Sequence, residues 1–203
     1  MDRREAIKRT ALFTGYALSS SVIAGVMQGC QPEPTGPDWT PQFFTEEQAS
    51  QVNAMVDVML PPTATPGAVE LGVPAFIDLM VKDWYQAKDQ THFLAGLEMV
   101  NQRAQTDHGK SFLKSSSEQQ LAVMNAIDED TRAKLKEQAI NQSGEEENED
   151  TPYWPFMHKF KNLALLGYFS SKKIGTEVLN YDPIPGGYEG CIPYEEGGAA
   201  WAL

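Results

Sequence analysis

Histidine and cysteine, the side chains that most often bind metals or act as acids, bases and nucleophiles, are rare in this chain of 203 residues. The histidines are His92, His108 and His158. No two are four residues apart and none belongs to a Glu-x-x-His motif, so the spacing of di-iron and zinc-protease sites is absent. Asp89 and His92 could share a helix face, but a surface hydrogen bond explains that pair better. We therefore predict no metal site.

The sequence also lacks the common catalytic motifs. It contains no glycine-rich phosphate loop, no Cys-x-x-Cys pair and no Gly-x-Ser-x-Gly nucleophile elbow. The glycine-dense stretch GGYEG, residues 186–190, lacks the preceding strand and following helix that a nucleotide-binding loop requires. We predict that the protein is not an enzyme and has no cofactor of its own.

One cysteine, Cys191, lies in a segment that is rich in proline and glycine and has no apolar period. We predict that residues 182–203 form an extended tail that docks on a partner. The residues flanking the cysteine suit contact with another protein better than contact with water: Tyr188, Ile192, Pro193 and Tyr194. An unpaired cysteine in an exported protein indicates a disulfide to another chain or a free thiol.

Other states of this tail stay open at the level of sequence. Cys191 could instead pack against the chain's own helices, or form a disulfide with Cys30 in a form that carries no lipid. The last residues, 199–203, are either a further docking element or a frayed end.

The N-terminus has the features of an export signal. Arg3, Arg4 and Lys8 precede a stretch, residues 10–32, that carries no charge. This stretch is diluted by Thr, Ser and Gly and suits a signal peptide better than a membrane-spanning helix, which needs about 20 predominantly apolar residues. We predict that residues 1–29 are a twin-arginine-type signal peptide that engages the twin-arginine translocase.

The end of this signal, Gly29 followed by Cys30, resembles a lipoprotein cleavage site. If Cys30 is acylated, residues 30–42 form a proline-rich tether off the membrane and Cys191 is the only thiol left. The alternative is soluble export with cleavage nearby. Either way we predict a periplasmic protein, associated with the membrane through a lipid anchor or through its complex.

The net charge of −12 excludes some partners. So acidic a chain is not expected to bind nucleic acid or to adsorb electrostatically to anionic lipid. Its length suits a single folded domain with a sizeable core.

Residues 43–181 are predicted to form one all-α domain, because their apolar residues recur at helical spacing and no alternating β-branched run appears. Residues 144–151 are predicted to be an acidic loop. Thr45 and Gln48 have capping-box spacing, Pro74 suits a first helical turn and Gly109 suits a C-terminal cap. The expected helices span residues 45–60, 74–86, 91–108, 115–130, 131–141 and 154–181.

Each of these helices except the weaker 131–141 has an apolar face that predicts the core. The stripes are Val52, Met55, Val56, Met59 and Leu60; Phe76, Ile77, Met80, Val81, Trp84 and Tyr85; Phe93, Leu97, Val100 and Ala104; Leu121, Met124 and Ile127; and Phe156, Phe160, Leu163 and Gly167.

Several short motifs in this chain are together typical of one family. The most specific are Leu60-Pro61, Thr65 to Ala68, Val73-Pro74, Phe76 to Asp78, Gly167 to Phe169, Tyr181, Pro185-Gly186 and Gly190-Cys191. With these motifs the chain resembles the gluconate 2-dehydrogenase subunit 3 family. The resemblance runs from about Phe44 to Pro193, without the acidic residues 144–151 and without the end of the chain.

The resemblance implies a non-catalytic small subunit of a periplasmic sugar, sugar-acid or polyol dehydrogenase. Its partner would be a large flavoprotein of the glucose–methanol–choline oxidoreductase (GMC) type that holds FAD, and a multihaem cytochrome c subunit could take the electrons through haem c. The small subunit would escort the folded flavoprotein through the twin-arginine translocase. We expect the interface in the Pro- and Gly-framed loops and the tail, at Pro66, Gly67, Tyr168, Phe169, Tyr181, Pro185, Gly186, Tyr188 and Cys191.

A second interpretation is a free-standing envelope lipoprotein that binds a small ligand such as a sugar between its helices. The candidate stacking groups would be Trp84, Tyr85, Trp154, Tyr168 and Phe169, although core packing explains these aromatic residues more simply. An enzyme in its own right is disfavoured by the missing motifs.

Overall fold

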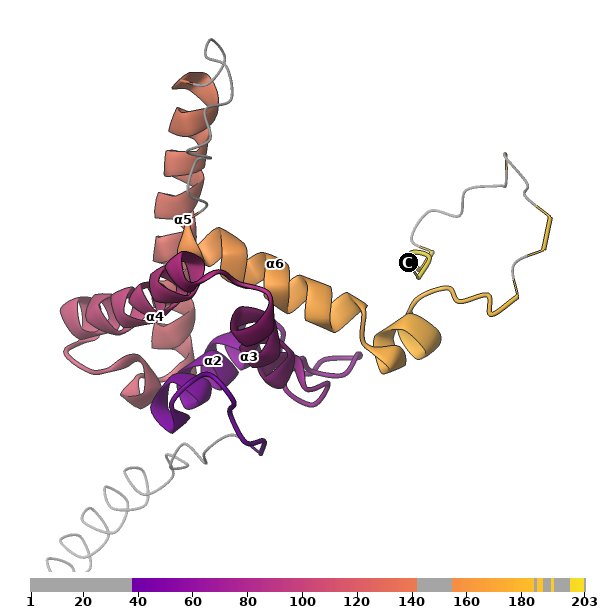
Figure 1. Cartoon of the computed structure of the whole chain (residues 1–203), viewed down its shortest axis with the longest axis horizontal. Helices are drawn as coiled ribbons and strands as arrows, with labels where there is room; N and C mark the ends of the chain where they lie inside the picture. The colour runs from indigo at the N-terminus through magenta and orange to yellow at the C-terminus, as the bar shows by residue number, and fades with distance from the viewer. Residues whose placement is uncertain (1–37, 142–154, 185, 188–190, 192–197, 203) are drawn as a thin grey trace, which may run out of the picture. The chain divides into compact units, whose positions relative to one another are not determined.

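The computed structural model describes residues 38–141, 155–184, 186–187, 191 and 198–202. Within these ranges the chain is helical, and its only β pairing is an isolated bridge, which confirms the all-α prediction (Figure 1). The elements are α2 (Glu46–Met59), α3 (Val73–Asp83), α4 (Ala87–His108), the 3-10 helix η1 (Phe112–Lys114), α5 (Ser117–Asn141), α6 (Phe156–Phe169) and the π-helix η2 (Ile174–Val178).

Some residues named in the sequence predictions lie outside the described ranges. They are the signal peptide 1–29 with Arg3, Arg4, Lys8 and Gly29, then Cys30 and the tether as far as residue 37, the acidic loop 144–151, Trp154, Pro185, Tyr188, Gly190, Ile192, Pro193, Tyr194 and residue 203.

The ends of the helices follow the local signals in the sequence. The Thr45 side chain accepts from the backbone N–H of Gln48, and the Gln48 side chain accepts from that of Thr45, so α2 begins with the predicted capping box. Gly109 ends α4 in the left-handed conformation at φ 68°. The helix α3 begins directly after Gly72, which is also left-handed, and Pro74 lies in its first turn.

The aromatic ring of Phe93 on α4 lies at the centre of the core. Its centroid is 5.1 Å from that of Phe156, 5.8 Å from that of Phe44 and 6.4 Å from that of Phe160. Burying each such ring contributes about 1.5–3 kcal/mol. The predicted stripe on this helix is buried in full: Phe93, Leu97, Val100 and Ala104.

Two glycines allow α6 to approach its neighbours closely. A Cβ atom at Gly96 of α4 would overlap the ring of Phe156. A Cβ at Gly167 of α6 would lie 2.8 Å from Cδ1 of Phe76 on α3. Any larger residue at either position would therefore push two helices apart.

A buried carboxylate fixes the start of the folded domain. Asp78 of α3, only 1% exposed, accepts hydrogen bonds from the backbone N–H groups of Gln42 (2.7 Å), Phe43 (3.1 Å) and Phe44 (2.9 Å). Lys82, one turn further along α3, donates to the side-chain oxygen of Gln42 at 2.7 Å. The segment that leads into α2 is thereby attached to α3 by charge-assisted hydrogen bonds.

Side-chain amides connect α2, α4, η1 and α5 inside the protein. Gln51 donates to the carbonyl of Leu97 at 2.7 Å and accepts from Asn101 at 2.9 Å. Asn101 in turn accepts from the backbone N–H of Phe112, and Gln120 donates to the Phe112 carbonyl at 2.9 Å. Each of these groups is satisfied, as buried polar groups must be.

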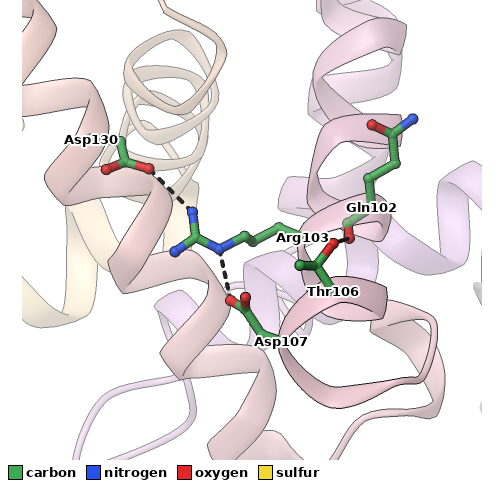
Figure 2. A network of polar contacts seen from close by, with 5 residues as sticks. All are labelled: Gln102, Arg103, Thr106, Asp107 and Asp130. Carbon is green, nitrogen blue, oxygen red and sulfur yellow. Dashed lines mark hydrogen bonds and ion pairs between the residues drawn. The ribbon is translucent and has the colours of Figure 1, made fainter.

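On the surface, an arginine joins α4 to α5. Arg103 contacts Asp107 through Nε at 2.7 Å and Asp130 through Nη1 at 3.2 Å, while the Thr106 hydroxyl bonds back to the carbonyl of Gln102 (Figure 2). The hydrogen bond that Arg103 donates to Asp107, with the charges of both carboxylates, raises the pKa of Arg103 above its ordinary value. These contacts orient the two helices. Because the groups are largely solvent-exposed, the ion pairs add little stability.

Three expectations about the helices that precede α6 are wrong. Residues 115–130 and 131–141 belong to one helix, α5, because Thr131 is buried against the domain and no glycine or proline interrupts the chain there. Leu121 is 46% exposed, since the adjacent Gln120 is the residue that turns inward. Trp84 is 78% exposed, because α3 ends at Asp83 before it can place Trp84 on its buried face.

Candidate partner-docking surface

The candidate surface begins at the C-terminal end of α6. The expected helix 154–181 is interrupted after Phe169, because the Ser170 hydroxyl bonds to the carbonyl of Leu166 at 2.6 Å and the Ser171 hydroxyl bonds to that of Tyr168 at 2.7 Å. The chain then turns into the π-helix η2, which is held to the core by the fully buried Ile174. Such π-helical turns often occur at functional sites.

A short loop, residues 60–72, lies against this end of α6. Within the loop, the N–H of Ala68 bonds to the carbonyl of Leu60 at 3.0 Å, and the N–H of Val73 bonds to that of Ala68 at 3.1 Å. Gly67 packs on Pro62 so closely that an added Cβ would lie 2.9 Å from the proline nitrogen. The loop therefore has a defined shape and requires glycine at this position.

Two side chains attach the loop to the C-terminal end of α6. The Tyr168 hydroxyl lies 3.1 Å from both the carbonyl oxygen of Pro66 and the hydroxyl of Thr65. Lys173 contacts Glu70 at 2.7 Å, and this hydrogen bond raises the pKa of Lys173. Because Tyr168 is only 8% exposed, its role within the chain is to hold the loop in place.

The C-terminal end of the chain returns to the segment after η2. The N–H of Asn180 bonds to the carbonyl of Ala200 at 2.8 Å, and the N–H of Ala202 bonds to the carbonyl of Asn180 at 2.9 Å, forming a parallel bridge between Asn180 and Trp201. The Asn180 side chain also donates to the carbonyl of Ala199 at 2.6 Å. Residues 199–202 are therefore paired with the chain itself, which decides against a frayed end.

Between the outer side of α6 and this returning segment lies an apolar groove of about 390 Å³. We call it the α6 groove. Several of its side chains are unusually exposed for apolar residues: Leu166 is 50%, Phe169 47% and Tyr181 54% exposed. The residues that line it are Leu165, Leu166, Phe169, Ser170, Ser171, Lys172, Gly175, Thr176, Tyr181 and Ala202.

The structure separates the residues that we expected at a partner interface. Phe169 and Tyr181 line the α6 groove, and Gly186 and Cys191 are exposed in the tail. Pro66 is half-buried, whereas Gly67 and Tyr168 are buried and shape the surface from below. Cys191 is a free and exposed thiol, so the packing of this residue against the chain's own helices is wrong.

Eight groove residues were not among the interface residues named from the sequence: Leu165, Leu166, Ser170, Ser171, Lys172, Gly175, Thr176 and Ala202. The sequence did contain a pattern that could have predicted the two leucines. Leu165, Leu166 and Phe169 have the i, i+1, i+4 spacing of a second apolar face, on the side of α6 away from the buried stripe of Phe156, Phe160, Leu163 and Gly167. Ala202 belongs to the tail that was predicted to dock on a partner, but its place in the groove depends on its hydrogen bond to Asn180 and could not be read from the sequence.

The aromatic residues considered for sugar stacking do not form one site, as far as the structure describes them; Trp154 lies outside the described residues. The ring of Tyr85 packs edge-on against Phe93 at 6.1 Å, and Tyr168 is buried under the loop 60–72. Trp84 is exposed at the end of α3, whereas Phe169 lines the α6 groove.

The described residues contain no group of three or more His, Cys, Asp or Glu placed to hold a metal ion. The carboxylate of Asp89, which the sequence placed beside His92, contacts Lys159 of α6 at 2.6 Å. Among the helices that the structure describes, none has both the length and the apolar character needed to cross a bilayer.

The fold and the surface define a class: a small helical protein that presents an apolar groove beside a rigid loop and a tail with a free thiol. The comparison with protein families is more specific. A family model described as gluconate 2-dehydrogenase subunit 3 matches residues 46–186, and the chain belongs to this family. No curated protein and no solved structure gives a significant match. The matched region contains α2 to η2 and ends before Cys191.

Proposed function

We propose that this chain is a non-catalytic accessory subunit that binds, exports and stabilises the FAD-holding subunit of a sugar, sugar-acid or polyol dehydrogenase. Family membership supports a role as a subunit of a dehydrogenase complex. The observation that carries the docking role is the α6 groove, which leaves Leu166, Phe169 and Tyr181 about half exposed. Contiguous apolar surface of this kind is costly in water and marks contact sites between proteins.

The rigid loop and the tail extend this docking surface. The Tyr168 and Lys173 contacts hold residues 60–72 beside the end of α6, so a partner meets a preformed shape. In the tail, Ile184 is 84% exposed and Trp201 61% exposed. Large apolar side chains at such positions supply binding energy when a partner covers them.

The exposed thiol of Cys191 would form a disulfide with the flavoprotein subunit. The thiol is free and exposed, and the periplasm is an oxidising compartment that allows disulfides to persist. A covalent link would keep the subunits together after export. Pairing with Cys30 is the competing outcome, and Cys30 lies outside the described residues.

Export is proposed to follow from the N-terminal signal. A flavoprotein folds around FAD before transport, and a bound subunit that carries Arg3 and Arg4 would take it through the twin-arginine translocase already folded. After cleavage at Gly29, acylated Cys30 would anchor the complex to the membrane at its periplasmic side. A multihaem cytochrome c subunit would complete the path of the electrons.

The test is the double variant Arg3→Lys/Arg4→Lys. We expect both this chain and its flavoprotein to stay in the cytoplasm, measured by fractionation and by dehydrogenase activity of the periplasmic fraction. Arg9→Lys is the matched control, because it makes the same exchange in the same cationic N-terminal segment but outside the pair, and it should leave export intact. If the flavoprotein of the double variant reaches the periplasm normally, the escort role is wrong.

A further inference from the structure

The α6 groove is apolar along its floor and contains a single charged residue. Of the residues that line it, only Lys172 belongs to a charged residue type. This is unusual in a chain with a net charge of −12. The next residue, Lys173, is paired with Glu70. Lys172 is exposed and has no ion-pair partner within the part of the chain that the structure describes, so its ammonium group is available to an incoming anion.

The described part of the chain's own tail does not fill the groove. Every residue from Asp182 to Trp201 that the structure describes is exposed, including Cys191 and the glycines 186 and 187. Only Tyr181 and Ala202, at the two ends of this segment, line the groove. Within the described residues the groove is therefore open to another molecule.

The bridge at the C-terminus offers an edge beside the groove. The carbonyl of Ala200 and the N–H of Ala202 face Asn180. In a parallel bridge the N–H and C=O of the residue between them, here Trp201, point to the opposite side. No described residue bonds to them there. An extended segment that lies in the groove could pair with this free edge, as in strand addition.

We propose that the α6 groove receives an extended apolar segment of the flavoprotein subunit, with a carboxylate of that segment paired to Lys172. The inference rests on the proposed function and adds the chemistry of the partner's contact. Apolar side chains fill the space along Leu165, Leu166 and Phe169, and the charge pair at the rim sets the register of the segment and favours the correct partner.

The test uses the full-length chain and the flavoprotein purified with it, with affinity measured by calorimetry at low salt. Lys172→Glu is expected to weaken binding at least about tenfold, because it opposes two negative charges, while Lys172→Arg retains binding. Lys134→Glu is the matched control, since Lys134 on α5 is also exposed and unpaired within the described residues. Leu166→Ser is expected to weaken binding about tenfold, against Leu121→Ser, whose side chain is 46% exposed compared with 50%.

A carbodiimide, which joins an amine to a touching carboxylate with loss of water, identifies the occupant directly. Mass spectrometry of the treated complex should show Lys172 linked to an Asp or Glu of the flavoprotein, and this link should be missing in Lys172→Arg. A link from Lys172 to a second copy of this chain, or to Glu195 or Glu196 of its own tail, would overturn the proposal.

The two proposals fail in different ways. If the wild-type chain binds the flavoprotein and the Lys172 and Leu166 variants bind it equally well, the groove is not the contact, although the accessory function stands. If the wild-type chain retains no flavoprotein when purified from its native membranes, the accessory function itself is wrong, and so is this inference.

Discussion

The hydroxyl of Tyr168 lies 3.1 Å from the carbonyl oxygen of Pro66, and it thereby joins residues separated by 102 positions in the chain. One residue belongs to the last turn of α6 and the other to the loop between α2 and α3. The contact places the rigid loop next to the α6 groove and makes the two a single surface. Both residues also belong to motifs by which the sequence resembles its family.

Removal of this hydroxyl should loosen the loop. Tyr168→Phe is expected to lower the free energy of unfolding by about 1 kcal/mol, because the ring stays buried and only the hydrogen bonds to Pro66 and Thr65 are lost. Urea denaturation measures the change. Tyr181→Phe is the control, since Tyr181 is 54% exposed, and equal effects of the two variants would contradict the assignment.

Replacement of Asp78 should lower the free energy of unfolding more than Tyr168→Phe does. In Asp78→Asn the side chain keeps one acceptor oxygen and brings an NH₂ group against the N–H groups of Gln42, Phe43 and Phe44, so we expect a loss of about 3 kcal/mol. Thermal unfolding followed by circular dichroism checks this. Asp83→Asn, at an exposed position of the same helix, should change little. A stability of Asp78→Asn close to wild type would show that the three amides do not need the charge.

The loss of folding stability at low pH should depend in part on Asp128. Partial burial acts to raise the pKa of this carboxylate, but the hydrogen bonds and charges of Lys161 and Arg132, each at 2.8 Å, lower it overall below the ordinary value of 3.8. A pKa depressed in the folded state stabilises the protein above the unfolded value, and this stability is lost as the pH falls through the folded value.

The variant Asp128→Asn should therefore be less stable than wild type at pH 7, by about 1 kcal/mol, and should lose less stability below pH 3.8. Melting temperatures measured from neutral pH down to about pH 2 give the comparison. Glu129→Gln is the neighbouring control, because Glu129 is exposed and carries no ion pair within the described residues. Parallel curves for Asp128→Asn and wild type would exclude a contribution from this carboxylate.

The thiol of Cys191 provides the last prediction. The wild-type complex should run as a linked pair on electrophoresis without reductant and as separate subunits with it, since this thiol is exposed. Cys191→Ser should abolish the linked band and leave the fold unchanged. The same mobility of the wild-type chain with and without reductant would exclude the covalent link.

The local signals in the sequence predicted the helices well. The Thr45 and Gln48 capping box, Pro74 and Gly109 act through residues within a turn of themselves, so they are readable without the fold. The buried stripe on α4 was equally readable from its period. Family membership could also be predicted from short motifs, and the family model confirms it over residues 46–186.

The predictions fail where contacts outside the local pattern decide whether a residue is buried. Leu121 fits a helical stripe, but the Gln120 side chain turns inward to reach the carbonyl of Phe112, and Leu121 is left outside. Trp84 fits a stripe too, but α3 ends before it. Asp78 looks like an ordinary helix carboxylate until the fold brings three backbone amides, 34 to 36 positions away in the chain, onto it.

The sequence by itself determined that the chain is helical, where α2 begins and α4 ends, which face of α4 is buried and which family the chain belongs to. These properties depend on neighbours along the chain. Only the tertiary structure decided that the loop 60–72 lies on α6, that Asn180 pairs with Trp201, and that Leu166 and Lys172 share an open groove. Each of these requires contact between residues far apart in sequence, and such contact is set by how whole elements pack.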